Sequence, residues 1–398
     1  MLGNPKSKIK FLPFLYVLIF LVVMYSVNDM ATSTNAYQEQ GNRSSVYIFL
    51  IGIIGWLGIY ALKIWSEKIN FFAPLGSIMI MTIWVFVDNL LLGNLLGREK
   101  WSALTHVGLS AWWILALVFG YYYPRNDKQK QNQLMLFVLG MFVYYCVQFL
   151  IVAIESNATH DETTILNLVY RVVVFVPAIY FLKNNFLKNA LLLFVFALTV
   201  VSMKRGAIII LPLMLLASSF VSNRENKDAL KKIGRIVIAV IIGLMAFVVA
   251  DKVTGGFLSH RFSIDELMYG SSRSEKYAQA INEISKRGLK ELIFGIGSGK
   301  RGGVHNEILE FLYTFGLVGL ILYIALIMSL CRRFLQLYKI KSKYAGQYAM
   351  IVVYFFVVGI YSGVYFVHGT FYIMLVLGMI ECRVNEEKKL CQKCQLEL

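Results

Sequence analysis

Apolar runs long enough to cross a bilayer follow one another from the start of the chain to its end. A transmembrane helix needs about 20 mostly apolar residues, and polar stretches separate twelve such runs. The predicted spans are 11–28, 46–65, 72–93, 102–122, 132–154, 164–182, 187–203, 206–221, 234–251, 306–330, 346–364 and 367–382. The pattern predicts an all-α polytopic membrane protein with about twelve transmembrane helices, in which no soluble domain of ordinary size remains.

Basic residues between the runs predict the orientation. The stretches expected in the cytoplasm carry several Lys or Arg each, whereas the predicted outer loops 29–45 and 155–163 hold almost none. Because short cytoplasmic loops collect Lys and Arg, both ends of the chain are predicted inside. The basic N-terminus and first apolar run resemble a signal peptide. No small-residue cleavage site follows them, so we interpret the run as an uncleaved first span.

This topology divides the chain into four parts. A membrane bundle of nine spans covers 1–251, an outer loop covers 252–305, three further spans cover 306–382, and a cytoplasmic tail covers 383–398. The outer loop is rich in Lys and Arg. Long loops escape the charge rule, so these residues agree with the topology. Binding of an anion would account for them.

Composition supports a membrane protein rather than a nucleic-acid-binding one. The chain is 58% hydrophobic and 16% charged, with a mean hydropathy of +0.63, whereas a soluble domain carries about a quarter charged residues. The net charge of +16 fits Lys and Arg that meet anionic lipid head groups, and we expect no nucleic-acid partner. Cys391 and Cys394 form a lone Cys-x-x-Cys without further ligands nearby, so no zinc site is predicted.

The outer loop holds a predicted amphipathic helix. Residues 272–275 (Ser-Arg-Ser-Glu) match a capping box, and apolar residues recur at roughly helical spacing from Tyr277 to Leu292. The helix is expected on the membrane surface or over the mouth of the bundle. Arg273 would stand at its N-terminal end, where the macrodipole favours an anion. A solvated surface arginine is the alternative.

A glycine-rich segment, 294–303 (Phe-Gly-Ile-Gly-Ser-Gly-Lys-Arg-Gly-Gly), follows the helix. It either lets backbone N–H groups approach a ligand or acts as a flexible connector, and the spacing to Lys300 excludes a P-loop. His305 and Asn306 then open the tenth span, with Glu310 one turn further. A histidine at a helix start is commonly a capping or interfacial residue. Its unperturbed pKa of about 6.5 also suits a proton acceptor.

Cations also occur where the membrane disfavours them. Lys204 and Arg205 lie in a very short outer turn, against the charge bias, and are predicted to face a polar cavity. Arg171 lies within an apolar stretch. An arginine there costs about 2.5–3.5 kcal/mol on insertion scales, so it needs a partner or a cavity. Asp88, near the outer end of the third span, is a candidate structural partner, with a functional role as the alternative. His368, in the last outer hairpin, is a further candidate.

These segments resemble the bacterial O-antigen ligase and polymerase superfamily. The similarity covers 202–325, with a Lys-Arg-Gly hairpin, Arg-Ser-x-x-Tyr in the outer loop, and a glycine segment followed by His-Asn, a Leu-rich helix start and Gly-x-x-Gly. The hallmark residues that match are Gly295, Gly297, His305, Asn306, Gly316 and Gly319. Many members have Ser/Thr-Arg at the hairpin, where this chain has Lys204-Arg205.

The resemblance implies a GT-C-like membrane glycosyltransferase in the bacterial inner membrane. Such enzymes use undecaprenyl-diphosphate-linked glycans at the outer leaflet and need no metal or cofactor. Carried over by motif, Arg205 and Arg273 bind the substrate diphosphate, with Lys204 beside them, and His305 accepts the proton. Arg171 has no assigned counterpart. The implied partners are the lipid-linked glycans, membrane lipids and a chain-length-determining membrane protein.

The predicted function is polymerisation of lipid-linked repeat units into O-antigen, capsule or exopolysaccharide, with inversion at the anomeric carbon. An O-antigen ligase, whose acceptor is lipid A-core, is the alternative within the family. A flippase or other transporter for lipid-linked oligosaccharide and a non-catalytic membrane scaffold are the alternatives from other classes. Substrate contact and a structural role both stay open for five residues: Arg171, Asp88, Asn306, Glu310 and His368.

Overall fold

The computed structural model describes residues 73–92, 94–95, 100–159, 163–202, 204–222, 248, 251–252, 272–298, 306–361 and 370–396. The chain divides into two compact units, Met1–Asn70 and Phe71–Leu398, and every described residue belongs to the second. The predicted spans 11–28 and 46–65, and most of 234–251, lie outside the described residues.

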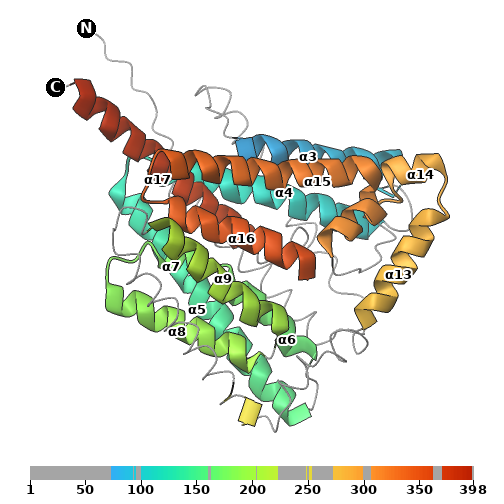
Figure 1. Ribbon diagram of the computed structural model, residues 1–398, viewed down its shortest axis with the longest axis horizontal. Helices are drawn as coiled ribbons and strands as arrows, with labels where there is room; N and C mark the ends of the chain where they lie inside the picture. Colours follow the sequence, from blue (N-terminus) through green and yellow to red (C-terminus); the bar gives the residue numbers. More distant parts are fainter. Residues whose placement is uncertain are drawn as a thin grey trace. The chain divides into compact units, whose positions relative to one another are not determined.

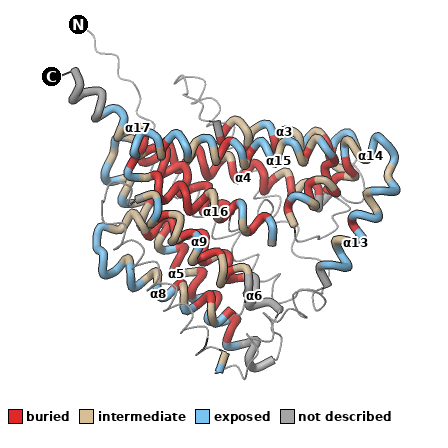
Figure 2. Tube along the Cα trace, viewed as in Figure 1, coloured by how far each residue is buried: buried red, intermediate tan, exposed pale blue. Residues whose placement is uncertain are grey.

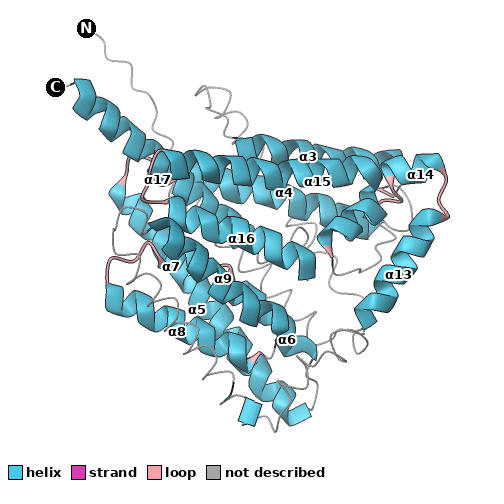
Figure 3. Ribbon diagram, in the orientation of Figure 1, coloured by secondary structure: helices cyan, strands magenta, loops and turns pink. Residues whose placement is uncertain are grey.

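All regular secondary structure in the described ranges is helical (Figures 1 and 3). The helices are α3 (Ala73–Leu91), α4 (Lys100–Tyr122), α5 (Lys128–Thr159), α6 (Thr163–Val173), α7 (Val176–Ile179), α8 (Asn185–Val201), α9 (Arg205–Ser222), α13 (Ser272–Ser285), α14 (Leu289–Phe294), α15 (Glu307–Lys339), α16 (Ala345–Tyr361) and α17 (Thr370–Leu396). Among the described residues, three stretches are long and apolar enough to cross a membrane: Pro74–Leu91, Lys128–Ile154 and Glu307–Lys339. Shorter apolar helices accompany them, as in a helical membrane protein.

Helix ends follow local polar signals in the sequence. The Asn184 side chain accepts a hydrogen bond from the Leu187 N–H at 3.2 Å and caps α8. Asp127 lies just before α5, and its carboxylate accepts hydrogen bonds from the N–H groups of Gln129 and Lys130 in the first turn. Both caps satisfy N–H groups that a helix start leaves without partners. Helix boundaries therefore fall within a few residues of the predicted spans at most described positions.

Three predicted segments differ from the helices observed. The predicted span 164–182 is two helices, α6 and α7, and Pro177 lies in the first turn of α7, where a missing N–H is tolerated. α15 contains a non-helical residue, Gly316, with φ of 65°. α17 continues beyond the predicted span at 382 through the predicted tail to Leu396.

The helices pack as close pairs. α17 packs along α4, α16 along α9, and α3 against both α4 and α15 (Figure 1). At the α4–α17 contact, a β-carbon on Gly378 would overlap the Leu117 carbonyl oxygen, and one on Gly120 would overlap the Leu375 carbonyl oxygen. Small residues thus bring two helix backbones together, as is common in membrane proteins. Figure 2 shows buried residues concentrated on α4, α16 and α17, whereas α8 and α13 are largely exposed.

Aromatic rings fill the interior between these pairs. The Trp112 ring on α4 lies 4.7 Å from the Phe371 ring on α17, centroid to centroid. The Tyr372 ring lies 4.8 Å from Phe175, between α6 and α7, and 5.5 Å from Tyr145 on α5. Rings of this size bury large apolar areas. They join α4, α5, the α6–α7 link and α17 into one core.

Polar contacts tie the C-terminal part of α17 to neighbouring elements. The Arg333 guanidinium on α15 donates two hydrogen bonds to the Glu381 carboxylate, at 2.8 and 2.6 Å. Glu386 accepts hydrogen bonds from the Asn126 N–H and the Gln131 side chain between 2.9 and 3.1 Å. The first residues of the predicted tail are therefore a packed continuation of the last helix.

Candidate functional site

The cationic turn between α8 and α9 is built on short local hydrogen bonds. The Ser202 hydroxyl donates to the Thr199 carbonyl at 2.7 Å and accepts from the Lys204 N–H at 3.3 Å. Arg205 is the first residue of α9, and its side chain lies outside the described part of the chain. The turn sets both cations at the N-terminal end of a helix, where the macrodipole favours bound negative charge.

The structure brings this turn to the helix that carries Arg171. A β-carbon on Gly206 would overlap the Tyr170 hydroxyl, so α9 begins directly against Tyr170 on α6. The Lys204 ammonium lies 6.0 Å from the centroid of the Tyr170 ring. Arg171 is half-buried, with its guanidinium carbon 5.9 Å from the centroid of the Tyr145 ring. Each of these two cations, predicted separately, therefore approaches a tyrosine ring within the range of cation–π attraction.

Asp88 is not paired with Arg171. Its side chain on α3 is 1% exposed, and neither carboxylate oxygen has a hydrogen-bond partner among the described residues. The indole N–H of Trp84, one turn earlier, is also buried without a partner in the described part. A buried carboxyl group in a membrane helix is costly and commonly functional. The structure thus leaves the role of Asp88 open.

The start of α15 is polar and partly buried. The Asn306 side chain accepts from the Leu309 N–H at 3.0 Å and donates to the Ile360 carbonyl at the end of α16 at 3.3 Å. Glu307 and Glu310 are buried, and Glu310 accepts a hydrogen bond from the hydroxyl of Thr314 one turn later. His305 immediately precedes this capped start and, like His368, lies outside the described residues.

Both polar regions lie on helices that pack against α16. α9, which begins with Arg205, packs along α16, and the Asn306 side chain at the start of α15 donates a hydrogen bond to the Ile360 carbonyl of α16. The helix that follows the Lys204 turn and the start of α15 therefore share α16 as a neighbour.

Up to residue 298, the glycine-rich segment packs against α15 and does not form an open anion-binding loop. The Ile296 and Gly297 N–H groups donate to the Thr314 carbonyl of α15, at 3.0 and 2.8 Å. Gly295 and Gly316 have φ of 78° and 65°, and a β-carbon on either would overlap the backbone of the other segment. The glycines allow this close approach, and the two N–H groups are already engaged.

The same segment is attached to the end of α3. The Asn89 side chain donates to the Ser298 hydroxyl and accepts from the Ser298 N–H, both at 3.0 Å. Asn94 donates to the Ile296 carbonyl at 3.4 Å. These contacts fix the chain at Ser298, which lies seven positions before His305 in the sequence.

Helix α13 packs against α15. Ala280 and Tyr313 form a small buried contact, to which Tyr277, Ile284, Ile296 and Leu309 add. Ile281, which we expected on the apolar face, is 57% exposed, and the predicted continuous helix is interrupted between α13 and α14. Arg273 is the second residue of α13, with its side chain outside the described part.

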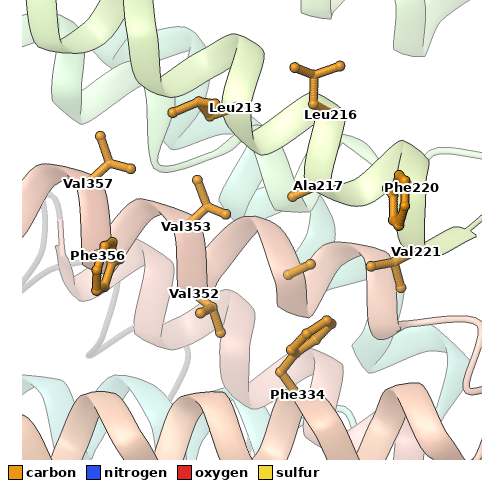
Figure 4. A pocket seen from close by; sticks show the side chains of 11 residues that line it. Leu213, Leu216, Ala217, Phe220, Val221, Phe334, Val352, Val353, Phe356 and Val357 are labelled. Carbon is orange, nitrogen blue, oxygen red and sulfur yellow. The ribbon is translucent and has the colours of Figure 1, made fainter. Parts of the chain in front are cut away.

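An apolar groove of about 690 Å³ runs between α9, α16 and α15 (Figure 4). Its lining is aliphatic and aromatic: Leu213, Leu216, Ala217, Phe220, Val221, Phe334, Ala349, Val352, Val353, Phe356 and Val357. No side chain in this lining can take a proton or bind a phosphate, so the groove is not the reaction site. Within the described ranges, no three His, Cys, Asp or Glu side chains come together as a metal site would need.

Sequence reasoning did not single out several residues that build this region. Tyr170, Tyr313 and Arg287 were not predicted as part of it because their partners are distant in sequence. Asn89 carried a usable signal, since it forms a consecutive polar pair with Asp88 inside an apolar run. Comparison with protein-family models and with curated proteins finds no match for this chain. Function must therefore be argued from the residues themselves.

Proposed function

We propose that this chain is a membrane glycosyltransferase that polymerises undecaprenyl-diphosphate-linked oligosaccharide repeat units. The product is O-antigen, capsular or exopolysaccharide, formed at the outer face of the bacterial inner membrane by a twelve-span protein with both termini in the cytoplasm. The observation that carries the proposal is the contact of the Lys204–Arg205 turn with the helix of Arg171. α9, which follows this turn, packs on α16, and so does the capped start of α15, which His305 immediately precedes in the sequence.

The chemistry is a single displacement at the anomeric carbon. A hydroxyl oxygen of the acceptor repeat unit attacks the anomeric carbon of the growing chain and forms the new glycosidic bond. The bond from that carbon to the diphosphate oxygen breaks, and undecaprenyl diphosphate leaves with the bonding electrons. The hydroxyl proton passes to the His305 imidazole, acting as general base. Attack opposite the leaving group inverts the configuration.

The cations would stabilise the leaving diphosphate. Negative charge grows on the bridging oxygen in the transition state, and preorganised positive groups there accelerate the reaction. Arginine suits this role because its planar fork stays charged and binds two phosphate oxygens at once. Arg205 and Arg273 each stand at the N-terminal end of a helix, whose dipole adds to the attraction. Lys204 supplies a third positive charge nearby.

A transporter of lipid-linked oligosaccharide is the second candidate. The observation that favours it is Asp88, a buried carboxyl group without a hydrogen-bond partner in the described part of the chain. Ionisable groups of this kind in membrane helices mark ion and proton pathways. An O-antigen ligase shares the proposed chemistry and differs in the acceptor.

Complementation in glycan-deficient bacteria tests the proposal. The wild-type gene, His305→Ala, Arg205→Ala and Arg273→Ala are expressed in a polymerase-null strain, with membrane levels checked by immunoblot. Lys183→Ala, an exposed cation on the loop before α8, is the matched control. We expect a glycan ladder for the wild type and the control, and a single repeat unit for the three variants. Ladders from all variants would contradict the mechanism, and rescue of a ligase-null or flippase-null strain instead would favour that alternative.

A further inference from the structure

Two candidate residues of the proposed reaction stand at the ends of helices that touch at one small contact. Arg273 lies at the start of α13, and His305 immediately precedes the start of α15. The two helices meet through Ala280 and Tyr313. A helix advances about 1.5 Å per residue as a stiff rod, so this contact determines how far apart the two starts lie.

The contact has a polar part built from three side chains. The Tyr313 hydroxyl donates a short hydrogen bond to the Glu283 carboxylate. The Arg287 guanidinium donates to the Tyr313 carbonyl at 2.5 Å and lies 4.1 Å from the centroid of the Tyr313 ring. Glu283 on α13 thus binds the Tyr313 hydroxyl, and Arg287, which follows α13, contacts the Tyr313 ring face and carbonyl.

The position of Tyr313 explains why its carbonyl is available. It lies three residues before Gly316, where α15 leaves helical geometry. Near such a break, carbonyls need partners from outside the helix. Arg287 serves the carbonyl of Tyr313, and the glycine segment serves that of Thr314. The break in α15 and the segment 287–297 therefore stabilise each other.

The apolar part of the contact is too small to hold α13 alone. Most described side chains of α13 are exposed, and only Ala280 among them is buried. A segment with few buried apolar contacts opens readily. The hydrogen bonds and the cation–π contact to Tyr313 therefore supply much of the docking.

We propose that Glu283, Arg287 and Tyr313 are positioning residues. They hold α13 on α15 and thereby set the start of α13, which carries Arg273, relative to the start of α15, which His305 precedes in the sequence. This inference rests on the proposed glycosyl transfer, in which the three residues act through the placement of α13 and not through contact with substrate. Misplacement of reacting groups by about 1 Å can cost roughly 10²-fold in rate, so loosening the contact lowers turnover.

The test combines turnover with an independent measure of docking, in full-length protein. The variants are Tyr313→Phe, Arg287→Ala and the double variant, and Lys290→Ala, an exposed cation on α14, is the control. Docking is measured as the distance between spin labels at Ala278 and Ile308, both exposed. We expect a broader, longer distance and a roughly 10- to 100-fold lower kcat in the double variant, with the control unchanged.

Rescue by a covalent bond separates positioning from a general folding defect. Cysteines replace Ala280 and Leu309, which pack in the same contact, in a background without the native cysteines. Oxidation should restore kcat to the double variant, and reduction should remove the gain.

The inference would be overturned if the double variant kept the wild-type Ala278–Ile308 spin-label distance but had a lower kcat. It would also be overturned if that distance broadened while kcat stayed at the wild-type value. A wild-type chain that docks α13 but makes no polymer would instead refute the proposed function, and the positioning role with it.

Discussion

The Tyr313 hydroxyl on α15 donates a hydrogen bond to the Glu283 carboxylate on α13, across 30 positions of sequence. The bond joins α15, the long apolar helix that follows His305 in the sequence, to α13, whose second residue is Arg273. Docking of α13 on α15 therefore depends on the charge of the Glu283 carboxylate, which lies outside the membrane-spanning helices.

We expect acid to weaken this docking. The hydrogen bond from Tyr313 lowers the pKa of Glu283 below its ordinary value of 4.5, and a second one from Gln279 contributes less. Because the ionised form makes the contact, the stabilisation is fully present above pH 4.5 and is lost as the pH falls through the lowered pKa. The Ala278–Ile308 spin-label distance should broaden in that range in the wild type. The same pH response in Glu283→Gln would contradict this.

Gly316→Ala should destabilise the protein. The residue has φ of 65°, and a β-carbon there would overlap the Ile293 carbonyl oxygen. With ψ of −164°, the residue lies in a backbone region that is essentially restricted to glycine, and this conformation alone costs alanine about 1–3 kcal/mol. The overlap would also displace α14 from α15. Thermal unfolding in detergent should show a lower Tm. The matched control is Gly140→Ala on α5, where a β-carbon meets nothing within 4 Å and alanine should be neutral or stabilising.

Gly378→Ala tests the α4–α17 pair in the same assay. The added methyl group would overlap the Leu117 carbonyl oxygen, and overpacking of this kind costs about 1–3 kcal/mol. We expect a lower Tm without loss of α13 docking, because the contact lies in another helix pair. A Tm equal to that of Gly140→Ala would refute the close approach of these two helices.

Removing one partner of the Arg333–Glu381 pair should cost more than removing both. Glu381 is 2% exposed and accepts two hydrogen bonds from the guanidinium. Glu381→Ala leaves the Arg333 guanidinium as a poorly solvated positive charge. Removing one partner of a buried ion pair costs about 3–5 kcal/mol. The double variant Arg333→Met, Glu381→Leu keeps the volume and removes both charges. A lower free energy of unfolding for the double variant than for Glu381→Ala, measured by chemical denaturation, would contradict this account.

The sequence could predict most of the local structure because apolar runs and caps are local signals. The spans at 72–93 and 206–221 match α3 and α9 closely for this reason. The break at Gly316 could not be predicted, since the apolar pattern continues through it and the carbonyls next to it are satisfied by partners about 20 residues earlier. The candidate pairing of Arg171 with Asp88, one of two alternatives for Asp88, is not observed, because tertiary packing decides which side chains meet.

The candidate site was predictable in its residue types but not in its arrangement. Cations such as Lys204, in a short turn between two apolar runs, are visible in the sequence. The approach of Lys204 to Tyr170, and the packing of α9 on α16 beside α15, depend on tertiary structure that local sequence does not specify.

The most direct test of the central claim is glycosyl transfer by the purified full-length protein. The protein is reconstituted in lipid vesicles with undecaprenyl-diphosphate-linked repeat units, and both chain length and released undecaprenyl diphosphate are measured by mass spectrometry. We predict one undecaprenyl diphosphate released for each glycosidic bond formed, and loss of both products in His305→Ala but not in Lys183→Ala. Folded wild-type protein that releases no undecaprenyl diphosphate, or a His305→Ala variant that makes polymer at the wild-type rate, would contradict the account.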